Sequence, residues 1–285
     1  MLTKNKIVFF LLFSIVYKVE AIDSTLLQSS NKGWLYAYWG YNRAFYSNSD
    51  IHFISPNYDI TFYNLSAHDR PSPFTFENYV KPNNVFVTQY NIRVGYFPLP
   101  NWHFSVGMDH MKYVVDQGQK VRASGYVSPA FYPQFGGNHN MDSFTVGGDS
   151  LSFEHTNGLN LASFDIDYLQ PLFPLAKRRI WVKWNTGFGG FFAVTKTELR
   201  IFNEGIDNRF HLSGLCAFVK TGPRIEILKY FIMGFEWKAG YMNLPSVLIH
   251  NDEPKHAEHR FYFWEYYGYM GMQVPIKKWF TKSKK

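Results

Sequence analysis

The feature that most constrains this chain is an alternation of apolar and polar residues with a period of two, repeated along many segments. Because neighbouring side chains of a strand point to opposite faces, each such segment is predicted to be a β-strand with one apolar and one polar face. Helical periodicity is nearly absent, so the expected fold is all-β and antiparallel. The predicted strands cover residues 34–46, 50–54, 58–65, 86–97, 102–115, 161–172, 179–194, 208–219, 229–242 and 260–276.

Two architectures use long, two-faced strands: a soluble sandwich and a closed transmembrane β-barrel. Several predicted strands are longer than usual for globular proteins and match the ~9–11 tilted residues that cross a bilayer. Their apolar faces carry Trp and Tyr toward the ends, as aromatic girdles do. Their polar faces mix charges with glycines such as Gly107 and Gly187, which suits a crowded interior. The pattern therefore favours the barrel.

The first 21 residues are typical of a secretory signal peptide. Lys4 and Lys6 precede the apolar run 7–16, and the small residue Ala21 ends a plausible cleavage site. The expected organisation is a signal peptide (1–21), an N-terminal segment (22–33), the barrel (34–276) and a basic tail (277–285). No later apolar run reaches the ~20 residues that a membrane-spanning helix needs.

The net charge of +7 comes from the two ends of the chain, because the last nine residues alone hold five lysines. Residues 22–276 are close to neutral, so a nucleic-acid partner is not expected. Cys216 is the only cysteine, which excludes an internal disulfide and a Cys-rich zinc site. The histidines show no repeated ligand spacing, and we predict neither a metal nor another cofactor.

Connection lengths orient the predicted strands, since outer-membrane barrels have short periplasmic turns and long outer loops. Residues 98–101 and 173–178 form short connections, whereas 116–159 is expected to be a long extracellular loop. If both chain ends are periplasmic and the number of strands is even, the predicted strands give a barrel of 8–12 strands, and eight or ten fit best. A barrel of this size is filled by side chains or leaves only a narrow lumen. Charged residues on the polar faces then form a neutralising network in the lumen: Arg93, Lys183 and Lys238 with Asp109, Asp165, Asp167, Glu236 and Glu265.

The signal peptide, the long alternating strands and the Tyr- and Trp-rich faces resemble bacterial outer-membrane β-barrel proteins over residues 34–276. Five segments resemble a group of uncharacterised members of that class: Gly40–Ala44, Ser49–Phe53, Gln89–Arg93, Gly107–Lys112 and Glu154–Asn160. The resemblance implies the cell outer membrane as location and the outer-membrane assembly machinery as partner, but no activity. Typical members end on an aromatic residue, whereas this chain ends in a lysine-rich tail with Phe280 as its nearest aromatic.

Polar side chains gather at the predicted outer end, where the lipid is lipopolysaccharide. A histidine with a carboxylate can serve as general base toward an ester or amide, and Arg or Lys binds phosphate. One hypothesis is therefore a hydrolase acting on lipid A in the outer leaflet. Its candidate catalytic residues are His110, His155, Asp50, His52, Asp109, Ser152 and Glu154, and its candidate ligand-binding residues are Arg43, Arg70, Lys112 and Asn157.

Two other hypotheses remain open from the sequence. In the first, which the sequence favours, the barrel is not an enzyme and has a structural, binding or small-solute channel role. In the other, the protein is a soluble secreted barrel or sandwich that holds an apolar ligand, and its aromatic faces converge inward. The hydrolase hypothesis is limited by geometry, because adjacent residues such as Asp109 and His110 point to opposite faces of a strand. Only Asp50 with His52, and Ser152 with Glu154, share a face if those segments are extended.

Overall fold

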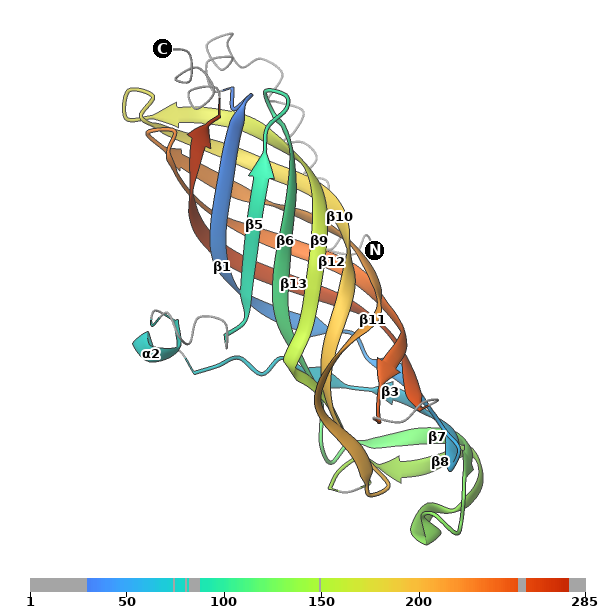
Figure 1. The fold of residues 1–285 in the computed structure, drawn as a ribbon. Helices are drawn as coiled ribbons and strands as arrows, with labels where there is room; N and C mark the ends of the chain where they lie inside the picture. Colours follow the sequence, from blue (N-terminus) through green and yellow to red (C-terminus); the bar gives the residue numbers. More distant parts are fainter. Residues whose placement is uncertain are drawn as a thin grey trace, which may run out of the picture.

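The computed structural model describes residues 30–73, 75–79, 81, 88–148, 150–250 and 255–276 (Figure 1). The predicted signal peptide and the basic tail 277–285 lie outside these residues. The helical elements are α2 (Phe76–Tyr79) and the short 3-10 turn η3 (Pro133–Phe135). Within the described ranges, no helix combines the length and the hydrophobicity that crossing a membrane requires. The strands are β1 (Trp34–Tyr46), β2 (Ser49–Ser55), β3 (Tyr58–Leu65), β4 (Ala67–His68), β5 (Tyr90–Tyr96), β6 (Trp102–Val115), β7 (Lys120–Val127), β8 (Gly137–Thr145), β9 (Leu151–Leu175), β10 (Ile180–Ile201), β11 (Glu204–Ile227), β12 (Phe231–Leu248) and β13 (His256–Pro275).

Eight of these strands are paired in a ring, in the order β1-β5-β6-β9-β10-β11-β12-β13. The ring returns on itself because β1 pairs with β5 along one edge and with β13 along the other, from Trp34↔Pro275 to Tyr46↔Phe263. All pairings are antiparallel, as expected for an all-β chain. We refer to these eight strands as the ring.

The strand number differs from the expected eight or ten, because the described residues form thirteen strands of one sheet. The additional strands β2, β3, β7 and β8 continue the sheet from the N-terminal end of β13. We call these four strands, together with the ends of the ring strands that pack on them, the extension; it lies at the lower right of Figure 1. Segment 116–159 is thus not a long loop, as predicted, but contains the hairpin β7–β8 and the first part of β9.

Several ring strands run far past the length that a bilayer requires. β9 has 25 residues and β10 has 22, so β9 is about 80 Å long at ~3.3 Å per residue. β10 and β11 are joined at the extension end by a tight turn at Phe202 and Asn203, both with positive φ, where the sequence led us to expect a longer connection. The connections at the opposite end, residues 97–101, 176–179 and 228–230, are all short.

The polarity of the two faces reverses along these strands. In β9, the inward residues Ser163, Asp165 and Asp167 are followed toward the extension by inward Leu161 and Leu159. The outward face changes in the opposite sense, from Phe164 to Asn160. β13 shows the same reversal, with Glu265 inside the ring and Phe261 inside the extension. The interior is therefore charged in the ring and apolar in the extension.

Large apolar side chains cover the outside of the charged part of the ring, and we call this surface the belt. Their outward orientation agrees with the predicted lipid-facing side of each strand, and Met270 is the most exposed of them at 69%. On β6 the belt ends at Met108. The belt contains Leu35, Val94, Tyr96, Trp102, Phe104, Val106, Met108, Phe164, Phe173, Phe188, Phe192, Leu215, Val219, Phe231, Met233, Trp237, Tyr241, Tyr262, Trp264, Tyr266, Met270 and Met272.

Candidate functional site

The ring interior is filled by a network of charged side chains. Arg93 on β5 contacts Asp109 of β6 at 2.7 Å and Asp165 of β9 at 2.9 Å. Lys238 on β12 joins the network at Asp109, 2.7 Å away, and at Glu265, 2.9 Å away. These contacts are the lumenal pairing that the sequence predicted. They also place Asp109 deep inside the ring and not at the rim, where the hydrolase hypothesis needed it.

The network also contains three charged residues of β11 that sequence reasoning missed. Lys220 lies 2.6 Å from Asp165, and Arg224 and Lys183 both lie against Glu226. The signal was available, because every second residue of β11 from Cys216 to Glu226 points inward. The expected strand 208–219 ended before most of this alternation.

Glycines on the inward face provide room for this network. A Cβ atom on Gly107 would lie 2.4 Å from Cδ of Arg93, and one on Gly187 would lie 2.0 Å from a carboxylate oxygen of Asp167. Such separations are far below van der Waals contact, so only glycine lets these charged side chains cross the neighbouring strand. The predicted role of inward glycines in a crowded interior is thus visible in the packing.

The candidate base His155 lies in the apolar core of the extension. Its Nδ1 is 3.0 Å from the hydroxyl of Thr197, while Nε2 has no hydrogen-bond partner in the described part of the chain. Burial lowers the pKa of His155 to about 3. His155 is therefore a neutral imidazole surrounded by aromatic side chains, with no carboxylate to orient it as a base.

The candidates Asp50 and His52 lie on β2, outside the ring. His52 Nε2 is 2.6 Å from Asp59 Oδ1 of β3, so its carboxylate partner is not the predicted Asp50. Asp50 instead accepts a hydrogen bond from the backbone N–H of Asn64, at 2.8 Å. The pair shares a strand face as expected, but each residue is bound elsewhere.

The remaining candidates lie on β6 and β9. His110 Nδ1 is 2.8 Å from Asn160 Oδ1, and its ring stacks on Tyr90. Asn157 donates a hydrogen bond to Glu198 of β10, and Ser152 pairs through its backbone register with Arg200. The predicted catalytic residues are thus distributed over the ring interior, the extension core and two parts of the outer surface.

Three of the four predicted ligand-binding residues do come together, on the outside of β1 and β6. Lys112 lies past Met108, the last belt residue of β6, and Arg43 pairs in register with the belt residue Tyr266. Arg43 comes from β1, Lys112 from β6, and Arg70 from the segment that leads to α2. Burial and the nearby guanidinium groups of Arg70 and Arg43 lower the pKa of Lys112, although Asp69 opposes them. We call Arg43, Arg70 and Lys112 the cation cluster.

The surroundings hold the cation cluster in place. Arg43 donates to the carbonyl oxygen of Asn42 at 2.7 Å and to the hydroxyl of Tyr79 in α2 at 3.1 Å. Lys112 Nζ lies 3.3 Å from Ser72 Oγ. Arg70 forms two contacts with Glu154, at 2.9 and 3.1 Å. Helix α2 and the segment before it therefore position the three cations next to the apolar belt.

The described residues contain no group of three or more His, Cys, Asp or Glu side chains arranged to hold a metal ion. Cys216 is buried, as a small side chain within the apolar core.

Comparisons with known proteins show a likeness in structure but none in sequence. No protein-family model matches the sequence, and no curated protein matches it. The chain is similar to the crystal structure of the outer membrane protein OprG from Pseudomonas aeruginosa, with 10% sequence identity and a TM-score of 0.39. The match covers 87% of this chain and 98% of that chain.

Proposed function

We propose that the protein is a transmembrane β-barrel of the bacterial outer membrane, with a sealed lumen and a structural or binding role in the outer leaflet. The observation that carries this proposal is the reversal of polarity along the ring strands. The ring is apolar outside and charged inside, whereas the extension is apolar inside. Only the ring has the distribution that a lipid environment favours, so the ring spans the bilayer and the extension projects from it. Delivery by the outer-membrane assembly machinery is part of the proposal.

A sealed lumen fits the burial of its charges. The charged side chains of the network are at most 3% exposed, and those of Arg93 and Asp109 are fully buried. Ions crossing the ring would have to displace paired charges, which is costly in a low-dielectric interior. The side-chain packing therefore favours a structural or binding role over a small-solute channel.

The cation cluster supports binding of lipopolysaccharide through its phosphate groups. Its three cations lie beside the belt, at the level where the head groups of the outer leaflet would begin. Guanidinium groups bind phosphate through two parallel hydrogen bonds, and an ammonium group adds a compact charge. The lipid A hydrolase alternative has no comparable support, because its histidines and carboxylates do not meet.

Membrane insertion is tested by extracting cell membranes with alkaline carbonate and by reconstituting the purified protein into planar bilayers. We expect the protein to stay in the membrane pellet and to give no stepwise conductance. Release into the supernatant would contradict the membrane location and favour the soluble alternative. Stable conductance steps would contradict the sealed lumen.

Phosphate recognition is tested with lipopolysaccharide and its dephosphorylated form, added to the protein in phosphatidylcholine nanodiscs. We expect Arg43→Gln combined with Lys112→Gln to weaken binding of the phosphorylated lipid, and added salt to weaken it further. Lys120→Gln is the matched control, because Lys120 is an exposed cation of β7. Equal binding of the two lipid forms would contradict phosphate recognition. Mass spectrometry of the recovered lipid would reveal any hydrolysis.

A further inference from the structure

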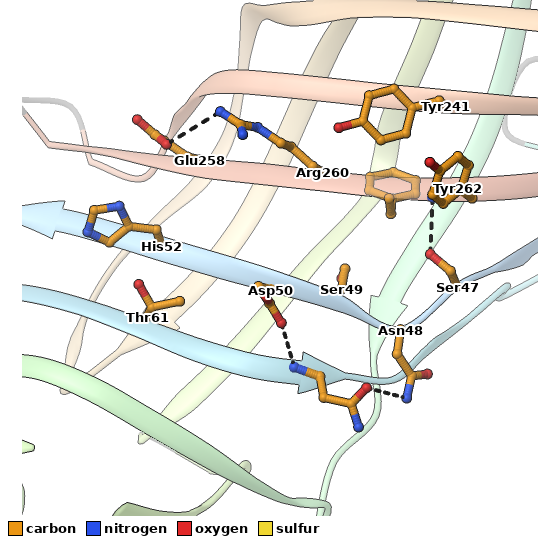
Figure 2. Close-up of a pocket in the computed structure, with 12 residues that line it drawn as sticks. Ser47, Asn48, Ser49, Asp50, His52, Thr61, Tyr241, Glu258, Arg260 and Tyr262 are labelled. Atoms are coloured by element: carbon orange, nitrogen blue, oxygen red, sulfur yellow. Dashed lines mark hydrogen bonds and ion pairs between the residues drawn. The ribbon is translucent and has the colours of Figure 1, made fainter. Parts of the chain in front are cut away.

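A hollow of about 360 Å³ lies on the outer surface where β2 and β3 leave the ring (Figure 2). Its volume is within the range of ~300–1,000 Å³ that is usual for small-molecule sites. One wall belongs to β12 and β13, and the other belongs to β2 and β3. The side chains that matter for its chemistry are Asp50, Thr61, Tyr241, Glu258, Arg260 and Tyr262.

One wall is aromatic and is formed by the two belt residues that lie nearest the extension on β12 and β13. Tyr241 and Tyr262 lie side by side on β12 and β13, with their ring centroids 5.0 Å apart. Tyr262 is 59% exposed, so its ring is open to a ligand. An exposed aromatic ring offers an apolar surface, and the phenolic hydroxyl adds a polar group at its edge.

The other walls present side chains with oxygen and nitrogen atoms that can hydrogen-bond to a ligand. Asp50 uses Oδ1 for the backbone N–H of Asn64, which leaves Oδ2 for a ligand. Among the described residues, Glu258 has one long contact, at 4.0 Å to a terminal nitrogen of Arg260, drawn in Figure 2. Arg260 donates through Nε to Asn243 at 3.0 Å, which leaves its other terminal nitrogen for a ligand. Carboxylates accept hydrogen bonds and guanidinium groups donate them.

We propose that this hollow binds a neutral saccharide. A sugar ring has an apolar C–H face that packs on an aromatic ring, and hydroxyl groups that donate to carboxylates and accept from a guanidinium. The hollow offers all three, from Tyr262, from Asp50 and Glu258, and from Arg260. Two carboxylates beside one cation disfavour a phosphate, which belongs to the cation cluster. The proposal does not depend on phosphate binding there.

The position of the hollow admits two sources of sugar. Ser47, at its edge, follows Arg43 by four residues along the chain, which is about 13 Å in an extended strand. The sugars of an outer-leaflet glycolipid would therefore reach the hollow, as would a free oligosaccharide from the medium. Both sources share the same chemistry at the site.

The experiment uses the full chain in phosphatidylcholine nanodiscs without lipopolysaccharide. Saturation-transfer NMR and calorimetry measure binding of maltose, cellobiose, lactose, chitobiose and maltotriose, with inorganic phosphate as a competitor. A second set of nanodiscs contains a neutral dihexosyl glycolipid. We expect at least one neutral sugar to bind in one of the two arms, and binding confined to the glycolipid arm would identify the membrane as its source.

Substitutions locate the binding. Asp50→Asn and Glu258→Gln each keep the side-chain shape and are expected to weaken affinity about tenfold, because hydrogen bonds to a charged group are lost. Tyr262→Leu removes the aromatic face and should weaken binding as well. Asp142→Asn and Tyr126→Leu, at exposed sites in the extension, are the matched controls and should bind as the wild type does.

Three results would overturn the proposal. The first is no binding of any of these sugars in either arm. The second is unchanged affinity in the three site variants, with folding confirmed by heat-dependent gel mobility. The third is displacement of a bound sugar by inorganic phosphate, which would indicate an anion site. None of these results bears on membrane insertion or on the cation cluster, which have their own tests.

Discussion

His155 and His259 lie 6.4 Å apart, measured between ring centroids, within the apolar core of the extension. Each keeps one ring nitrogen, Nε2 of His155 and Nδ1 of His259, without a hydrogen-bond partner. Their other nitrogens contact hydroxyl groups, Thr197 for His155 and Ser49 for His259. Tyr113 is a titratable side chain that packs beside both rings, and its hydroxyl is hydrogen-bonded to the hydroxyl of Ser49 at 3.0 Å. Neither histidine has a carboxylate among its described contacts to stabilise a positive charge.

The first prediction concerns acid. Burial lowers the pKa of both histidines, to about 3 for His155, whereas an unfolded chain binds these protons at ~6.5. The folded state therefore binds fewer protons than the unfolded state. The free energy of unfolding has its full value above pH ~6.5 and falls as the pH decreases toward 3. Over this window each histidine lowers the free energy of unfolding by about 1.4 kcal/mol per pH unit. The protection factors of the β2 and β3 backbone amides, which correct hydrogen exchange for its intrinsic pH dependence, should fall between pH 7 and pH 4.

Substitution of one histidine checks the origin of the acid effect. His155→Phe should reduce the pH dependence, because an aromatic ring fits among Phe153 and Tyr113 without titrating. His68→Gln is the control, since His68 is exposed and paired with Asp116. Acid sensitivity that persists unchanged in His155→Phe would contradict the assignment.

The second prediction concerns the lumen. Asp109→Asn removes the charge that Arg93 and Lys238 share, and breaking a buried pair in this way costs about 3–5 kcal/mol. Urea unfolding in lipid vesicles measures the loss. Ser105→Ala is the control, because Ser105 is a buried, uncharged residue of the same strand. Equal stability of the two variants would mean that the network does not hold the ring together.

The third prediction concerns a glycine. A side chain at Gly107 would overlap with Arg93 and with the backbone oxygen of Ile92, so Gly107→Val should destabilise the ring by about 1–3 kcal/mol. Gly268→Ala provides the comparison, because the nearest atom to its new Cβ is 4.0 Å away. The same unfolding measurement would refute the packing argument if both variants behaved alike.

The fourth prediction separates a lipid-facing belt from an ordinary protein surface. In a bilayer, Met270→Arg should lower the free energy of unfolding by about 2–4 kcal/mol if residue 270 lies near the bilayer midplane. On a water-exposed surface the same substitution changes stability by no more than about 0.5 kcal/mol. Tyr126→Arg, at an exposed apolar site of the extension, should show the small effect. A small effect at Met270 would support the soluble alternative.

Much of the ring was predictable from the sequence because apolar and polar residues alternate regularly along its strands. β1 and β6 have the expected limits, 34–46 and 102–115. The inward position of Arg93 and the outward position of Met108 also follow the predicted faces. In these segments one face must be apolar and the other polar, so the period of two fixes both the strand and its orientation.

The extension was predicted in part, since β2 and β3 correspond to the expected strands 50–54 and 58–65. The strands β7 and β8 and the first part of β9 were missed for a physical reason. Along β9 the apolar face changes sides near Leu161, so that Leu159 and Phe153 point inward while Asn160 and Glu154 point outward. A search for one continuous apolar face ends at such a reversal and assigns the remainder to a loop. The reversal itself was visible in the sequence, and it marks the place where the surroundings of a strand change.

The site was less predictable than the fold, because it depends on contacts between distant strands. The grouping of Arg43 with Arg70 and Lys112 follows from the path of the segment before α2, which strand periodicity does not fix. His52 was paired with Asp50 by their spacing along one strand, but its partner Asp59 comes from β3, across the hairpin. Local spacing shows which side chains share a face, and only the strand register shows which of them meet.

The shared course of β9 and β10 has a mechanical consequence. Both strands pass from the ring into the extension as single strands, and they pair on both sides of the reversal, with an irregularity in register between Thr195 and Glu198. A load applied to the extension is therefore transmitted along these strands toward the paired charges inside the ring.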